Sequence, residues 1–165
     1  VSVNDGAEWI QGLVDVHRPD AVRILDFMHA AQHLAEAGRA VYGEDTPEFH
    51  AWFQSQRTQL KTGSPDNVLN ELRTLEGATT DSAIQQTVHS AWNYLHQRRA
   101  LICYADFQAQ HYPIASGAAE SANKRVVESR LKGSGMRWKP DRVNPMLAMR
   151  NMICNGRSIF MPMRM

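Results

Sequence analysis

The sequence predicts an α+β fold that is predominantly helical, with two short strands near its start. Two observations lead to this prediction. Alternating, β-branched segments are confined to the first 27 residues, and apolar residues recur at helical spacing through most of the chain that follows. The 165 residues are 43% hydrophobic and 21% charged, which is typical of one globular domain with its own core.

The first thirty residues predict a strand, a helix and a second strand. VSVN ends in the turn sequence Asn4-Asp5-Gly6, and the helix after it ends before Pro19. AVRILDF, residues 21–27, alternates and predicts the second strand. Because a strand–helix–strand crossover makes its strands parallel, both strands should end at one edge of a sheet. Apolar residues at helical spacing around Trp9 favour a core position for this side chain.

The rest of the chain predicts a succession of helices, with serines and prolines at their starts and glycines at their ends. The expected helices are 30–42 before Gly43, one from Pro47, one from Pro65 to Gly77 with Ser64 as its cap, 81–98, 100–110, 118–132 with Ser116 as its cap, and one from Asn144-Pro145 to Gly156.

Charge is distributed unevenly along the chain. Residues 1–117 hold 8 Lys and Arg against 14 Asp and Glu, whereas residues 118–165 hold 10 against 3. A basic segment of this kind indicates a nucleic-acid contact, and a solvated helix surface is the alternative.

The sequence predicts neither a transmembrane span nor a disulfide framework. No stretch approaches the roughly 18 apolar residues that a membrane span needs. The two cysteines, Cys103 and Cys154, lack the spacing of a metal site or a disulfide framework. We therefore expect a protein of the reducing cytoplasm that contacts no membrane.

Three acidic residues are candidates for chemistry. Asp5 follows a strand end, where ligands collect in open α/β folds and where a carboxylate suits Mg²⁺, although it could simply cap the next helix. Asp26 lies at the end of the second strand and three residues before His29, again with helix capping as the alternative. Glu120 begins an otherwise basic helix, where it could instead form an ordinary pair with Lys124.

Metal-dependent cleavage of phosphodiesters is a reaction in which these acidic residues and the nearby cations would act together. Two divalent ions can clamp the attacking and leaving oxygens of an in-line displacement, and converging carboxylates are needed to hold them. Asp5 and Glu120 could supply two such ligands, while the cations beyond Glu120 would bind the phosphate backbone.

Four segments carry a resemblance to a known family. NDGAEWI, ILDFMHAAQHL, YPIASGAAESANKRVVESRLKGSGMRW and NPMLAMRNMICNGR resemble DDE transposases of bacterial insertion sequences, with the Kra-type elements nearest. The resemblance covers nearly the whole chain in order and is weakest over residues 44–110. It implies a partial RNase H-like core comprising its last two strands, residues 1–32, a helical insertion domain over 33–110, and a catalytic Glu helix with basic C-terminal helices over 111–165.

The resemblance also implies roles for the acidic residues. Asp5 matches the second catalytic Asp and Glu120 the final catalytic Glu, both as ligands of a two-metal Mg²⁺ or Mn²⁺ site. Asp26 and His29 match a supporting D-x-x-H signature. The family's first catalytic Asp would lie upstream of Val1, so we expect this chain to be a C-terminal fragment that binds metal weakly and cuts no DNA.

The activity implied for the parent enzyme is strand cleavage and strand transfer of an insertion sequence, by a homo-oligomer acting on double-stranded DNA in the bacterial nucleoid. The residues expected to contact DNA are Lys124, Arg125, Arg130, Lys132, Arg137, Trp138 and Lys139, with Trp138 stacking on a base. Trp9 is a second candidate for stacking, although its helical spacing favours the core. The alternative is a non-catalytic helical module for DNA binding or assembly, and an inert remnant is a third reading.

Overall fold

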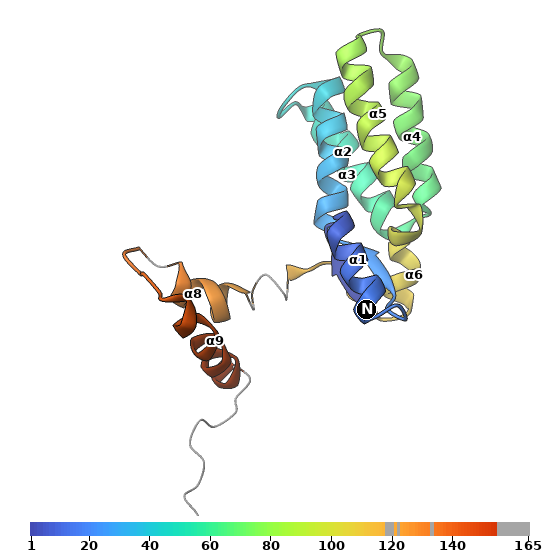
Figure 1. Ribbon diagram of the computed structural model, residues 1–165. Coiled ribbons are helices and arrows are strands. Elements are labelled where there is room, and N and C mark those ends of the chain that lie inside the picture. The colour runs from blue at the N-terminus through green and yellow to red at the C-terminus, as the bar shows by residue number, and fades with distance from the viewer. Residues whose placement is uncertain (118–120, 122, 133, 155–165) are drawn as a thin grey trace, which may run out of the picture. The chain divides into compact units, whose positions relative to one another are not determined.

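The computed structural model describes residues 1–117, 121, 123–132 and 134–154, with the backbone alone for Arg125 and Arg130. The chain divides into two compact units, Val1–Ser116 and Gly117–Met165. Both strands and most of the described helices belong to the first unit. The described part of the chain is therefore a predominantly helical α+β protein, as the sequence predicts (Figure 1).

A small parallel sheet begins the first unit. Strand β1 (Ser2–Asn4) pairs with β2 (Arg23–Leu25), and helix α1 (Glu8–His17) connects them. The predicted crossover with parallel strands is confirmed. The predicted second strand, 21–27, was too long, because the carboxylate of Asp26 accepts hydrogen bonds from the next backbone amides and begins a helix there.

Helices make up the rest of the first unit, and the predicted starts at Pro47 and Pro65, the predicted helix 81–98 and the predicted end before Gly43 are confirmed to within a residue. The helix predicted from residue 30 begins earlier, at Phe27, because Asp26 caps it, and the helix predicted to end at Gly77 continues to Ala78. The predicted helix 100–110 is divided into a 3₁₀ turn and a helix that starts at Tyr104. Gly43, at a φ of 88°, follows the first long helix in a conformation that glycine tolerates. The elements are α2 (Phe27–Tyr42), α3 (Pro47–Thr62), α4 (Pro65–Ala78), α5 (Ser82–Gln97), the 3₁₀ turn η1 (Arg99–Leu101) and α6 (Tyr104–Ala109).

The four long helices form a bundle with the sheet at one end (Figure 1). Helix α2 packs against α3 and α5, and α4 packs against the same two helices. Leucines at helical spacing fill the space between them, and Leu34, Leu60, Leu72 and Leu95 are fully buried. The core continues into β2 through Leu25, whose carbonyl accepts a 2.9 Å hydrogen bond from the buried hydroxyl of Tyr104.

Helix α1 departs from the sequence-based expectation. Trp9 was expected in the core, but its side chain is 72% exposed, and no residue of α1 is buried. Leu13 and Val16 are exposed beside it in the helical repeat. The periodicity identified an apolar face correctly, but periodicity does not specify which other element covers such a face.

The second unit contains a π-helical turn η2 (Lys124–Glu128), the short helix α8 (Ser129–Leu131) and α9 (Pro140–Cys154). The last helix was expected to begin at Asn144-Pro145, but it begins at Pro140. Proline suits the first position of a helix, and Pro145 within the helix lacks an N–H to donate. Among the residues that the structure describes, no helix is both long enough and apolar enough to cross a membrane.

The Tyr104 hydroxyl predicts a measurable contribution to stability. Tyr104→Phe leaves the buried Leu25 carbonyl without its partner, so the free energy of unfolding should fall by about 1–3 kcal/mol. Urea unfolding measures the change. Tyr112→Phe, at a half-buried position, is the control and should change stability by less than about 0.5 kcal/mol. Equal effects of the two substitutions would contradict the role assigned to the Tyr104 hydrogen bond.

Candidate functional site

The two aspartates of the sequence analysis follow neighbouring strands. Asn4 pairs with Leu25 at the end of the parallel ladder, so Asp5 and Asp26 are the next residue on each strand. The backbone N–H of Asp26 donates to the Asn4 carbonyl at 2.7 Å, which continues the ladder by one bond. Both residues therefore lie at the carboxyl edge of the sheet, where open α/β folds bind ligands.

Asp26 is a buried carboxylate whose two oxygens are both engaged. Oδ1 accepts from the backbone N–H groups of Met28, at 2.8 Å, and His29, at 3.2 Å, which caps α2. Oδ2 accepts from the backbone N–H of Ser116 at 2.5 Å. Burial raises the pKa of Asp26, but hydrogen bonds from Ser116, His29 and Met28 outweigh it and hold the pKa below its ordinary value of 3.8.

The segment before Ser116 runs beside the end of β2. The backbone N–H of Phe27 donates to the Ile114 carbonyl at 2.9 Å, and Ser116 then reaches Asp26. This segment is ninety residues away in sequence from the strand that it meets. Glu120 follows Ser116 by four residues and lies outside the described part of the chain, and the predicted capping role of Ser116 concerns that same stretch.

The turn after β1 presents Asp5 to solvent. Its Oδ1 accepts from the backbone N–H of Ala7 at 3.0 Å, which closes the turn before α1. Ala7, not Asp5, is the N-cap of α1, so the helix-capping alternative considered for Asp5 is wrong. Asn4 supports the same turn, because its Oδ1 accepts from the N–H of Gly6 at 2.9 Å and from the Gln11 side chain at 2.8 Å. Asp5 is nevertheless exposed, so its carboxylate remains accessible at the sheet edge.

The C-terminal end of helix α5 contacts this turn directly. The Tyr94 hydroxyl donates to the Asp5 carbonyl at 2.8 Å, and Arg98 Nη2 donates to the Gly6 carbonyl at 3.2 Å. The Arg98 guanidinium also lies over the Tyr94 ring, 3.9 Å from its centroid. The helical block thus fixes the backbone of the candidate metal ligand.

Gly6 is required by this arrangement. Its φ of +78° lies in the left-handed region, which other residues rarely adopt. A Cβ atom at position 6 would lie 2.8 Å from Arg98 Nε and 2.9 Å from Leu25 Cδ1. Both the conformation and the close approach of α5 therefore exclude a side chain here.

His29 lies half-buried in the first turn of α2 and belongs to a group of rings. Its ring centroid is 5.5 Å from that of His33 and 6.0 Å from that of Tyr94, and the His33 and Tyr94 rings are 3.9 Å apart. Burial lowers the pKa of His33, helped by the charges of His29 and Arg98, although Glu36 at 3.3 Å opposes the shift. His33 is therefore neutral at pH 7.

Sequence reasoning missed four participants: His33, Tyr94, Arg98 and Ser116 as an anchor of Asp26. His33 could have been found, because it lies one helical turn after His29. Tyr94 and Arg98 share a face of α5, but no local signal connects them to a turn 89 residues earlier.

Carboxylate oxygens of the kind that Asp5 offers suit a hard cation such as Mg²⁺. Asp26 fits a positioning role instead, because both of its oxygens already accept backbone hydrogen bonds. Within the described ranges no group of three or more His, Cys, Asp or Glu could hold a metal ion. Pairing of Asp5 with Glu120 remains a prediction, since Glu120 lies outside those ranges.

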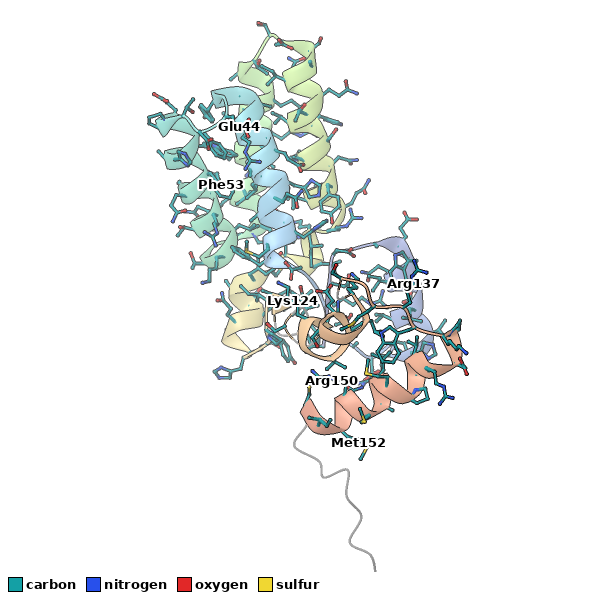
Figure 2. All side chains as sticks on the ribbon, turned by 90° about the vertical axis from the view of Figure 1, so that its left-hand side faces the viewer. Glu44, Phe53, Lys124, Arg137, Arg150 and Met152 are labelled. Atoms are coloured by element: carbon teal, nitrogen blue, oxygen red, sulfur yellow. The ribbon has the colours of Figure 1, made fainter. Side chains whose placement is uncertain are left out.

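The second-unit cations that were expected to contact DNA are exposed wherever the structure describes their side chains. Lys124 and Arg137, labelled in Figure 2, are solvent-accessible, as are Lys132 and Lys139. Lys132 also pairs with Glu128 at 3.2 Å, and Trp138 is 39% exposed. The side chains of Arg125 and Arg130 lie outside the described part of the chain. Exposure of the other side chains is compatible with contacts to DNA phosphates and also with a solvated surface.

Asp26 predicts a specific pH dependence. Asp26→Asn keeps an oxygen acceptor but removes the titrating carboxyl. Because the native pKa lies below the unfolded value, the charge stabilises the fold above about pH 4, and this contribution is lost as the pH falls through the native pKa. The variant should be less stable than wild type at pH 7, with a difference that shrinks below about pH 4.

Urea unfolding at several pH values measures this difference, with the exposed Asp106→Asn as control. The control should not reproduce the pH-dependent loss. A stability difference for Asp26→Asn that is the same at pH 7 and pH 3 would contradict the assignment.

Two glycines provide a matched pair. Gly6→Ala should lower the free energy of unfolding by about 1–3 kcal/mol, because it imposes strain at a positive φ and a clash with Leu25. Gly12→Ala, in α1 with no atom within 4 Å of the new Cβ, should raise it by about 0.5–1 kcal/mol. Thermal unfolding of both variants tests this, and a neutral Gly6→Ala would disprove the constraint.

Comparison of the chain with protein-family models, with curated proteins and with solved structures finds no match in any of the three.

Proposed function

We propose that the chain belongs to a DDE-type DNA transposase with an RNase H-like core, in which Asp5 and Glu120 are ligands of Mg²⁺ or Mn²⁺. The bound ions would polarise the scissile phosphate and activate the attacking water or 3′-hydroxyl. The reactions are metal-dependent strand cleavage at the ends of an insertion sequence and then strand transfer. The proposal rests on the resemblance described above and on the geometry of the sheet edge.

The observation that carries the proposal is the 2.5 Å hydrogen bond from the Ser116 N–H to Asp26. It fixes the chain just before the Glu120 segment at the edge that also carries Asp5. A site with ligands 115 positions apart needs such an anchor, because each bond that orders the connecting segment reduces the entropy lost when a metal binds.

The proposal gives Asp26 and His29 supporting roles. Asp26 caps α2 and holds the 114–116 segment, so it positions both sides of the site without binding metal. His29 is fixed in the same turn, within reach of the edge, and could contact the DNA near the scissile bond. Tyr94 and Arg98 act through the backbone of the Asp5 turn and are positioning residues.

DNA binding would come largely from the basic second unit. The exposed cations Lys124, Lys132, Arg137 and Lys139 would neutralise backbone phosphates, and Trp138 would stack on a base. Arg125 and Arg130 would add to this surface. A homo-oligomer on paired element ends is part of the same proposal.

A non-catalytic module for DNA binding or assembly is the second candidate. The exposure of the same cations favours it equally, because phosphate binding by these cations does not require Asp5 or Glu120. The two candidates differ in one respect: only the transposase proposal requires a divalent ion between the Asp5 turn and the Glu120 segment.

Mn²⁺ titration monitored by amide NMR distinguishes the candidates. Mn²⁺ should broaden the signals of residues near Gly6 and near Ser121, because a paramagnetic ion at the site lies close to both. Asp5→Asn and Glu120→Gln should each weaken this effect by at least the roughly tenfold that even an outer-shell change costs a metal site. Asp15→Asn, on the exposed side of α1, is the control and should leave the broadening unchanged.

Broadening that is absent near Gly6 and Ser121, or that persists in both variants, would disprove the metal site. Salt-dependent binding of duplex DNA that continues without any Mn²⁺ effect would then favour the non-catalytic module. The titration reports on the residues themselves and needs no cleavage activity.

A further inference from the structure

One face of α3 gathers hydrogen-bond donors without any carboxylate. Gln54, Arg57, Thr58 and Lys61 recur at helical spacing, and together with Phe27 they line a pocket of about 270 Å³. The Thr58 hydroxyl donates to the Gln54 backbone carbonyl, so the groups left to face a ligand are an amide, a guanidinium and an ammonium. Such a lining suits an anion.

The two cations of this pocket lie in an acidic unit. Residues 1–117 contain 14 acidic and 8 basic residues, and four of these eight Lys and Arg form ion pairs with described residues. Arg18, Arg23, Arg73 and Arg99 each form an ion pair. Within the described ranges neither Arg57 nor Lys61 has an acidic partner.

Arg57 is also oriented by the fold. Its guanidinium lies 5.8 Å from the centroid of the Phe27 ring, and Phe27 is buried. A flat apolar surface under a guanidinium leaves its N–H groups directed outward in a fixed plane, which matches the oxygens of a phosphate. Lys61, one helical turn further, adds a second charge on the same face.

The pocket adjoins the candidate site. Phe27 directly follows Asp26, and its backbone N–H donates to Ile114 of the segment that leads to Glu120. A nucleic-acid strand that reached the carboxyl edge of the sheet would therefore find these donors beside Phe27, the residue after Asp26, on the acidic unit rather than on the basic one.

We propose that Arg57, Lys61 and Gln54 form a binding site for backbone phosphates of duplex DNA next to the Asp5–Asp26 edge. The site rests on the proposed function for its ligand, but it uses residues that the resemblance does not assign. It places a phosphate contact on the helical block, in addition to the contacts proposed for the cations of the second unit.

The salt dependence of duplex binding tests the site. Each lost phosphate contact makes the slope of log K against log salt shallower by about 0.9, so Arg57→Gln/Lys61→Gln should change it by about 1.8. Affinity at low salt should fall at least about tenfold, since two charged hydrogen bonds are removed. Lys61→Gln alone, at an exposed position, should change the slope by about 0.9 and guards against misfolding of the double variant.

Arg39→Gln/Arg18→Gln is the matched control. Arg39 lies 5.4 Å from the centroid of the buried Phe49 ring, as Arg57 lies over Phe27, and Arg18 is exposed like Lys61. The control removes the same charge from the same unit. A larger change in salt slope for Arg57→Gln/Lys61→Gln than for the control would therefore show that the effect is specific to the pocket and is not caused by net charge alone. Equal slopes for the two double variants would overturn the site.

The remaining outcomes are also decisive. If wild type binds inorganic phosphate at this pocket, by the amide shifts of Gln54 and Thr58, but binds no duplex, the proposed DNA contact is overturned in favour of a small phosphorylated ligand. If the slope change occurs although Mn²⁺ does not broaden the Gly6 signals, the phosphate site stands and the proposed metal chemistry fails.

Discussion

The buried carboxylate of Asp26 is the interaction on which the first unit depends. Its two oxygens join three segments: the end of β2, the first turn of α2 and the 114–116 stretch. A buried carboxylate is tolerated only when it is hydrogen-bonded, and here the backbone amides of Met28, His29 and Ser116 donate to it, as does the Ser116 side chain. The start of the bundle and the chain leading to Glu120 both take their positions from the sheet edge.

The helical bundle stabilises the small sheet whose edge carries Asp26. A parallel sheet of two three-residue strands is too small to be stable alone, so it depends on packing against helices. The Tyr104 hydroxyl donates to the Leu25 carbonyl of β2. Tyr94 and Arg98, at the end of α5, donate to the carbonyls of Asp5 and Gly6 in the turn after β1. Contacts from residues 27–110 thus fix the backbone of the turn that carries Asp5, the candidate metal ligand.

Acidic and basic residues are distributed unevenly between the two units of the chain. Acidic groups dominate residues 1–117 and basic groups dominate the remainder, yet Arg57 and Lys61 keep their charge free of acidic partners among the described residues. In a DNA-binding protein the net negative charge of the first unit would oppose non-specific binding of DNA there, and a pair of cations without acidic partners would attract phosphates locally.

The sequence by itself determined the parallel crossover, the starts of the helices at Pro47, Pro65 and Ser82, and the placement of Asp5 and Asp26 at the ends of neighbouring strands. These features depend on local chemistry: alternation, helical spacing, and the preferences of Ser, Pro, Asp and Gly at helix ends. Only the tertiary structure decided that Asp26 binds Ser116, that α5 holds the Asp5 turn and that Trp9 is exposed. Those outcomes depend on which distant segments meet, and side-chain periodicity defines a face without specifying its partner.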